Sequence, residues 1–156
     1  MKCRAYAKVN LGLDVASKRE DGYHELKSIM VPIQLHDLID INVHHEMRFE
    51  CVPNFLIHPE KNTLLKMIEV CREKYHFSEN FAIRLFKHIP SQAGLGGGSS
   101  DAAAVLNYLD YFFKWNLSPQ EKIDLAVQVG ADVPFCLFEK PALVTGIGEK
   151  LEFFEN

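Results

Sequence analysis

Long apolar runs, paired cysteines and an excess of basic charge are all missing from this 156-residue sequence. No stretch approaches the roughly 18 apolar residues of a membrane-spanning helix. The N-terminus also lacks the charged and then continuously apolar pattern of a secretory signal peptide. The net charge of -4 gives no electrostatic reason to expect a nucleic-acid partner. We therefore expect no membrane association and no nucleic-acid binding.

The four cysteines also argue against a secreted, disulfide-linked protein. They lie far apart, at Cys3, Cys51, Cys71 and Cys136, and form no C-x-x-C pair. Such spacing favours free thiols in a reducing cytoplasm over a disulfide framework or a zinc site. The chain length suits one domain with its own core.

Hydrophobic periodicity and turn signals predict strands followed by helices mixed with strands. Strands are expected over residues 3–15, 24–32, 36–45, 47–52 and 81–89. In the first of these, one face is expected to be buried, because alternate residues are apolar: Ala5, Ala7, Val9, Leu11 and Leu13. Helices are expected over 62–75, 99–115 and 118–130, with Asn62 and Ser118 as N-caps. Segments 131–138 and 141–154 have strand character. This order favours an α+β fold in which a mainly antiparallel sheet carries helices on one face.

One segment has the residues of a phosphate-binding loop: IPSQAGLGGGSSDAAA, residues 89–104. It lies between a predicted strand and a predicted helix. The first amides of a helix have no intrahelical partners and carry partial positive charge, and glycines let phosphate oxygens come close to them. A flexible linker would not end in capping serines and an alanine-rich helix. The loop is therefore predicted to bind phosphate.

The two best-known phosphate loops do not match this segment. A Walker A loop requires a lysine after its glycines, and here Ser99 and Ser100 follow them. The dinucleotide fingerprint requires G-x-G-x-x-G, whereas this loop reads G-L-G-G-G.

Together with three further motifs, the loop carries a resemblance to a known family. It resembles the loop of the galactokinase, homoserine kinase, mevalonate kinase and phosphomevalonate kinase superfamily. The motifs AYAKVNLGLDV (residues 5–15), REDGYHEL (19–26) and GADVPFCL (130–137) narrow the resemblance to the 4-diphosphocytidyl-2-C-methyl-D-erythritol kinases of non-mevalonate isoprenoid synthesis. The resemblance implies a two-layer fold like the second domain of ribosomal protein S5.

The same resemblance implies ATP-dependent phosphorylation of the substrate's 2-hydroxyl group. Asp132 would be the catalytic aspartate that orients or deprotonates the hydroxyl, and Lys8 would pair with it. Asn10 would hydrogen-bond the substrate, and Tyr23 and His24 would recognise its cytosine by stacking and an edge contact. From the residues alone, Asp132 is also a good turn residue, and Lys8 and Asn10 also fit a solvated strand face.

The resemblance further implies the residues that contact ATP, which would bring Mg²⁺ with it. The adenine would lie nearer Asn62 and Lys87. The phosphates would lie on the loop and on the start of the helix, at Pro90, Ser91, Gln92, Ala93, Gly94, Leu95, Gly96, Gly97, Gly98, Ser99, Ser100 and Asp101. No residue is predicted to be a resident metal ligand, because the remaining histidines lack ligand spacing and His44 and His45 would point to opposite faces of a strand.

Members of this family carry a second, C-terminal domain beyond the segment that matches residues 141–154. We therefore expect residues 1–156 to form the N-terminal ATP-binding domain, with weak or absent activity alone and with self-association through an exposed apolar face. Two alternatives remain open at this point. One is another small-molecule kinase of the superfamily, and the other is a non-catalytic module that binds nucleotide or RNA.

Overall fold

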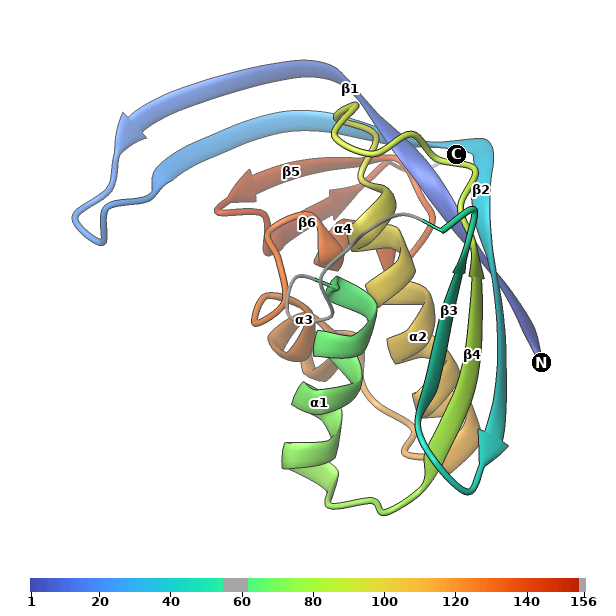
Figure 1. Ribbon diagram of the computed structural model, residues 1–156. Coiled ribbons are helices and arrows are strands. Elements are labelled where there is room, and N and C mark those ends of the chain that lie inside the picture. Colours follow the sequence, from blue (N-terminus) through green and yellow to red (C-terminus); the bar gives the residue numbers. More distant parts are fainter. Residues whose placement is uncertain (55–61, 155–156) are drawn as a thin grey trace.

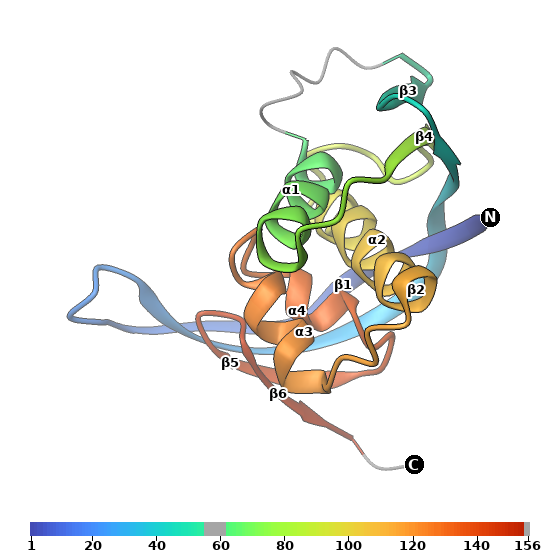
Figure 2. The same ribbon diagram turned by 90° about the horizontal axis from the view of Figure 1, so that it is seen from below.

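The computed structural model describes residues 1–54 and 62–154, and for Val15 and Ala16 only the backbone. It contains a six-stranded sheet in the order β3-β4-β2-β5-β6, with β1 paired to β2 outside this path. Helices cover one face of the sheet, which curves around them (Figures 1 and 2). Most of the loop predicted after residue 52, including His58, lies outside the described residues.

Strand β2 is the strand around which the sheet is organised. It runs over His24–His44, where the sequence predicted two strands. One edge pairs along its length with β1 (Lys2–Lys18), antiparallel. The other edge is shared by β5 (Ala142–Gly146) and β4 (Asn80–Phe86), which pair with opposite ends of β2. A stretch of β2 between β5 and β4 is therefore not covered by either strand.

The sheet is completed by β3 (Arg48–Val52), parallel to β4, and β6 (Lys150–Phe153), antiparallel to β5. Because β3–β4 is the single parallel pair in the described sheet, the prediction of a mainly antiparallel sheet is confirmed.

Within the described residues, four helices form the second layer: α1 (Thr63–Tyr75), α2 (Gly97–Phe113), α3 (Pro119–Ala126) and α4 (Val133–Cys136). Apolar side chains of α1 and α2 pack against those of β2 and β4 and form one core, including Ile39, Ile41, Leu64, Met67, Phe81, Ile83 and Leu106. The α+β prediction with helices on one face is confirmed. No helix of the described ranges is long and apolar enough to cross a membrane.

Both predicted N-caps are confirmed by their hydrogen bonds. The Asn62 side chain accepts from the amides of Leu64 and Leu65 at 3.0 and 3.2 Å. Ser118 forms a capping box with Glu121, in which each side chain accepts from the other residue's amide. Such caps satisfy amides that the helix itself leaves without partners.

Two sequence predictions about these elements are wrong. Residues 131–138 were expected to form a strand, but they contain the short helix α4, whose four residues are all buried. A fully buried apolar run has no period that separates strand from helix. In β1, Ala5 and Ala7 are buried as expected, but Leu11 and Leu13 are 71% and 58% exposed. Register shifts in the β1–β2 pairing interrupt the expected alternation.

The ends of β1 and β2 form an arm that projects from the body of the molecule (Figure 1). Leu11 and Leu13 lie on it, and Ile29, 39% exposed, pairs with Gly12 between them. Exposed apolar side chains on a projecting pair of strands are typical of surfaces that contact another chain or domain.

We predict that this arm makes the chain associate with itself at high concentration. Replacing Leu11 and Leu13 together by serine removes apolar surface that is already exposed, so the monomer is expected to fold while association weakens. Sedimentation velocity over a concentration series measures both effects. A parent protein that stays monomeric at the highest concentrations would contradict the prediction.

Candidate active site

A cavity of about 570 Å³ lies over the glycine-rich loop. Its wall is made by the start of α1, the end of β4 and the loop that leads into α2. The lining residues are Asn62, Thr63, Leu85, Lys87, Pro90, Ser91, Gln92, Ala93, Gly94, Leu95, Gly96, Gly97, Gly98, Ser99 and Asp101. The N-terminal end of α2 therefore opens into a cavity, which is the arrangement predicted for phosphate. Helix α2 begins at Gly97, two residues before the predicted start.

The loop is fixed to the free edge of β1 by two hydrogen bonds. The Lys8 amide donates to the Leu95 carbonyl at 2.9 Å, and the Ser100 hydroxyl donates to the Tyr6 carbonyl at 2.6 Å. Strand β1 pairs only with β2, so its second edge is available for these contacts. The Ser100 hydroxyl, predicted to contact phosphate, therefore has a structural partner.

Gly96 allows Lys8 to lie directly against the loop. It has a φ of 70°, and a Cβ there would lie 2.9 Å from Lys8 Cγ. A side chain at this position would meet both backbone strain and a steric contact. The Gly97 position differs, because a Cβ there would meet Lys87 Nζ at 3.0 Å and the Ile89 side chain at 3.1 Å. A side chain on Gly97 would therefore press on the residues beneath the loop.

Lys8 and Asp132 meet at the edge of the loop. Lys8 Nζ lies 3.4 Å from Asp132 Oδ2 and donates to Asn10 Oδ1 at 2.7 Å. The Lys8 side chain is 7% exposed and that of Asp132 is 35% exposed, so the lysine is buried while the carboxylate reaches solvent. Asn10 in turn donates to the Ser28 hydroxyl at 2.8 Å. The alternative that Lys8 lies on a solvated strand face is thereby excluded.

The turn that carries Asp132 is supported by the β5–β6 turn. Gly148 has a φ of 120°, and a Cβ there would lie 2.1 Å from the Ala131 carbonyl oxygen. On the other side of the turn, a Cβ on Gly130 would lie 3.9 Å from Ser99 Oγ. The Asp132 turn therefore lies between the start of α2 and the β5–β6 turn.

Lys87 does not extend freely towards the cavity as a phosphate-binding cation would. Its Nζ binds Asp37 and lies 3.0 Å from Asp101 Oδ2, and its side chain is 6% exposed. Burial alone would lower the pKa of Lys87, but Asp101 and Asp37 outweigh it, so the pKa lies above its usual value. In this structure Lys87 is an internal ion-pair partner beneath the loop that also lines the cavity, and its place near the adenine stays a prediction.

Asp101 is the second carboxylate of this buried group. Burial is the main cause that raises its pKa well above the usual value, opposed by Lys87 and assisted by Asp37. Its Oδ1 atom is buried and has no hydrogen-bond partner in the part of the chain that the structure describes. One ammonium thus faces two carboxylates, which leaves surplus negative charge in a buried place.

Tyr23 and His24, predicted to recognise the cytosine, lie apart from this group. Both are exposed at the outer end of the arm, where the Tyr23 amide donates to Asp21 Oδ1 at 3.1 Å (Figure 1). The structure brings together Lys8, Asn10, Asp132 and the loop, but it does not bring Tyr23 and His24 to them.

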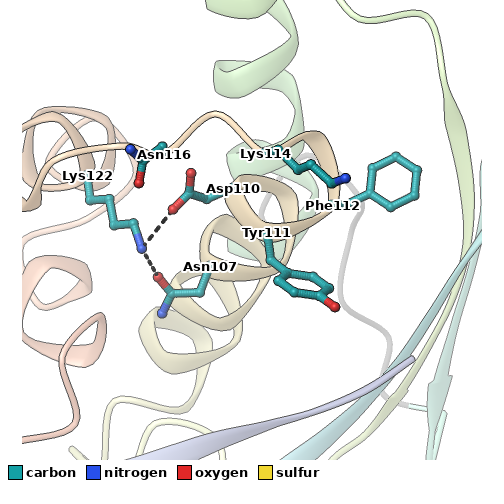
Figure 3. A pocket seen from close by; sticks show the side chains of 7 residues that line it. All are labelled: Asn107, Asp110, Tyr111, Phe112, Lys114, Asn116 and Lys122. Carbon is teal, nitrogen blue, oxygen red and sulfur yellow. Dashed lines mark hydrogen bonds and ion pairs between the residues drawn. The ribbon is translucent and has the colours of Figure 1, made fainter.

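A second cavity, of about 600 Å³, lies near the other end of α2 (Figure 3). Its lysine at position 122 is held by Asp110 at 3.1 Å and by Asn107 at 2.9 Å. The remaining lining residues are Tyr111, Phe112, Lys114 and Asn116. This cavity has neither a glycine-rich backbone nor a lysine–aspartate pair at a helix N-terminus, so we place the reactive site at the loop.

His44 and His45 do not point to opposite faces as expected. Their ring centroids are 4.1 Å apart, and with Glu46 they could bring three ligand atoms near one another. The Glu46 carboxylate, however, is already bound by the Arg48 guanidinium at 2.5 and 2.8 Å. We assign no metal site there.

Three positions that shape the site were not predicted: Asp37, Thr63 and Gly148. Thr63 joins the starts of α1 and α2, because its hydroxyl donates to the Gly98 carbonyl at 2.6 Å. Only Gly148 carried a local signal, as the second glycine of the segment GIGEK, although residues 141–154 were predicted as one segment of strand character. Asp37 and Thr63 act through contacts distant in sequence.

The chain belongs to the GHMP kinase family. The family model described as "GHMP kinases N terminal domain" matches residues 62–140, about half of the chain. The superfamily resemblance of the loop is thereby confirmed.

Curated relatives of this chain bear the name of the kinase family that the motifs indicate. The chain is 46% identical over its whole length to a 4-diphosphocytidyl-2-C-methyl-D-erythritol kinase of Caldanaerobacter subterraneus subsp. tengcongensis. It is 44% identical, over 97% of its length, to the kinase of that name from Clostridium beijerinckii. In each case it spans 54% of the relative, so the chain is about half as long as these curated relatives.

Solved structures confirm the fold. A crystal structure of 4-(cytidine 5'-diphospho)-2C-methyl-D-erythritol kinase matches 99% of this chain and 55% of its own, at 37% identity and a TM-score of 0.82. Phosphomevalonate kinase of Streptococcus pneumoniae, in complex with phosphomevalonate and AMPPNP, matches 94% of this chain and 50% of its own at a TM-score of 0.69, but at 10% identity it shows the shared fold alone. These neighbours confirm the predicted fold, like the second domain of ribosomal protein S5.

We predict that Gly148→Ala displaces the Asp132 turn and destabilises the protein by on the order of 1–3 kcal/mol, since both the positive φ and the Ala131 carbonyl oppose a side chain. Urea denaturation measures the loss, and the amide chemical shift of Asp132 reports the displacement. Gly146→Ala is the matched control, because its φ is 72° but its Cβ would meet only the flexible Glu149 side chain. An unshifted Asp132 amide in Gly148→Ala would contradict the prediction.

We predict a pH-dependent stability gain for Asp101→Asn. Because the pKa of Asp101 is raised on folding, its protonated form is favoured in the folded state, and this stabilisation is lost as pH rises through the folded pKa. Asparagine carries no such charge, so the Tm difference between variant and parent should grow from about pH 4, the unfolded value, towards neutral pH.

Thermal unfolding across this pH series checks the prediction. Glu50→Gln is the control, because it removes an exposed carboxylate that pairs with Arg84 on the surface. A Tm difference for Asp101→Asn that stays constant or shrinks as pH rises would show that the prediction is wrong.

Proposed function

We propose that this chain is the N-terminal, ATP-binding part of a kinase that phosphorylates the 2-hydroxyl of 4-diphosphocytidyl-2-C-methyl-D-erythritol. The observation that carries the proposal is the Lys8–Asp132 pair, 3.4 Å apart, at the edge of a glycine-rich loop that opens a helix. The names of the relatives support the substrate and the isoprenoid pathway. Action in the non-mevalonate branch and in the cytoplasm belongs to the same proposal.

The γ-phosphoryl group of ATP passes to the oxygen of the substrate hydroxyl, and ADP leaves. Asp132 accepts a hydrogen bond from that hydroxyl and takes its proton as the new P–O bond forms. Its exposure of 35% leaves the carboxylate accessible to a substrate. Backbone amides at the start of α2 hold the phosphates, and Gly94 and Gly96 leave them uncovered.

Lys8 has two effects in this scheme. Its ammonium, 3.4 Å from Asp132 Oδ2, holds that carboxylate in place at the edge of the loop. It also adds positive charge where the transferring phosphoryl group would pass between the loop and Asp132. Asn10, held by Lys8 and Ser28, presents an amide beside this position for a hydrogen bond with the substrate.

Mg²⁺, which neutralises phosphate charge in such transfers, would enter with the nucleotide. Among the loop residues, Asp101 is committed to Lys87 and the Ser100 hydroxyl to Tyr6. Ser99, beside the Asp132 turn, is therefore the hydroxyl best placed to contact the phosphates or the ion. The adenine is proposed to lie towards Asn62, whose Oδ1 caps α1.

The greater length of the relatives affects what activity can be expected of this chain alone. Because the chain spans about half of them, we propose that a further domain completes the substrate site, with the exposed arm as the surface nearest to it. Tyr23 and His24, exposed at the end of that arm, would then contact the cytosine from one side. The residues described here would bind ATP, while phosphorylation by this chain alone would be slow or absent.

We predict that Asp132→Asn lowers phosphorylation by on the order of 10²-fold, the usual effect of losing a general base. The assay follows product formation by ³¹P NMR, using the chain joined covalently to the C-terminal half of a full-length relative. ATP affinity is expected to change little, because the phosphates lie on backbone amides. Asp124→Asn, on the exposed face of α3, is the control for carboxylate loss.

Full activity of Asp132→Asn would refute the proposed mechanism. Titration with cytidine 5'-diphosphate and with mevalonate distinguishes the substrates, and binding of mevalonate alone would favour another kinase of the family. ATP binding without turnover in the joined protein would favour a non-catalytic nucleotide-binding module.

A further inference from the structure

Asp37 is a fully buried carboxylate in the part of β2 that neither β4 nor β5 covers. Strand β4 ends at Phe86, and the chain then passes Asp37 as it enters the glycine-rich loop. There the Asp37 Oδ1 atom accepts from the amides of His88 and Ile89, at 2.6 and 2.8 Å. A single oxygen thus fixes the first residues after the strand.

The other oxygen of Asp37 acts on the far end of the loop. Asp37 Oδ2 binds Lys87 Nζ, and the same ammonium lies 3.0 Å from Asp101 Oδ2 in the first turns of α2. Asp37, Lys87 and Asp101 therefore join β2, the end of β4 and the start of α2 below the loop. All three side chains are less than 7% exposed, so water does not compete for these contacts.

We infer that Asp37 is the positioning residue of the nucleotide loop: its carboxylate holds the strand end of the loop directly and the helix end through Lys87. The inference rests on the proposed function in that the loop receives ATP phosphates. Asp37 lines no part of the cavity and would not touch the nucleotide. It acts by keeping the amides of the loop in one arrangement before ATP arrives, and such preorganisation favours binding.

The chain offers a closely matched control in Asp110, farther along α2. Asp110 also pairs with a lysine, Lys122, at 3.1 Å (Figure 3). Its Oδ1 atom also accepts a hydrogen bond from a backbone amide, that of Leu117, at 3.1 Å. Asp110→Asn therefore removes the same kinds of interaction as Asp37→Asn, but outside the nucleotide loop.

The experiment compares Asp37→Asn and Asp110→Asn with the parent chain. Urea denaturation measures stability, amide hydrogen exchange measures loop order without nucleotide, and titration with Mg-ATP measures Kd. Asp37→Asn is expected to speed exchange at residues 88–100 and to raise the Kd by on the order of tenfold or more. Asp110→Asn is expected to leave both unchanged, even where its loss of stability is similar.

A second variant separates the two ends of the loop and serves if Asp37→Asn does not fold. Lys87→Met combined with Asp101→Asn cuts the link to α2 and removes one positive and one negative charge together, so the net charge of the buried group is unchanged. The double variant is expected to speed amide hydrogen exchange at residues 97–101 and to raise the Kd for Mg-ATP. The amides of His88 and Ile89 are expected to remain protected, because Asp37 still accepts their hydrogen bonds.

Normal loop protection in Asp37→Asn, or an equal rise in Kd for Asp110→Asn, would overturn the inference. In the double variant, a Kd for Mg-ATP equal to that of the parent, with unchanged amide hydrogen exchange at residues 97–101, would also overturn the inference. A parent chain that does not bind Mg-ATP, with a loop that still loosens in Asp37→Asn, would instead refute the proposed function and leave the role of Asp37 in ordering the loop intact.

Discussion

The contacts of one residue, Lys8, determine how the site is assembled. Its amide binds the Leu95 carbonyl, its aliphatic stem packs against Gly96, and its ammonium binds Asp132 and Asn10. A buried ammonium is stable only if oxygen atoms surround it. The fold therefore has to bring the Asp132 turn to β1, and the same contact brings the loop beside it. One residue of β1 therefore determines both where the loop lies and where the Asp132 carboxylate lies.

A second buried ammonium, that of Lys87, holds the loop from below. The two lysines lie on either side of the glycine-rich segment, and each is bound by at least one carboxylate. Because these charges are already neutralised, the positive potential offered to phosphate comes largely from the amides at the start of α2. Of the three carboxylates that bind these lysines, only Asp132 is accessible to a reacting hydroxyl. This difference in burial separates the reactive pair from the structural one.

Local signals were enough to predict the caps at Asn62 and Ser118, the glycine-rich loop that leads into a helix, and the α+β class. These local signals could not predict roles that depend on contacts between residues distant in sequence. The buried ion pairs of Lys87 could not be predicted, because its two carboxylates come from β2 and α2. Asp37 gave no signal at all. The segment 131–138 was taken for a strand because a buried apolar run has no distinctive period. Leu11 and Leu13 were assigned to the core because irregular pairing of β1 is not visible in the sequence.

The central claim is that the loop and the Lys8–Asp132 pair form one phosphoryl-transfer site. It is tested most directly by a crystal structure of the chain with Mg²⁺ and a non-hydrolysable ATP analogue. The account predicts that the β- and γ-phosphates lie on the amides of residues 94–100, with the γ-phosphate facing Lys8 and Asp132. A nucleotide bound in the cavity beside Asp110 and Lys122, or with its phosphates directed away from Lys8, would contradict it.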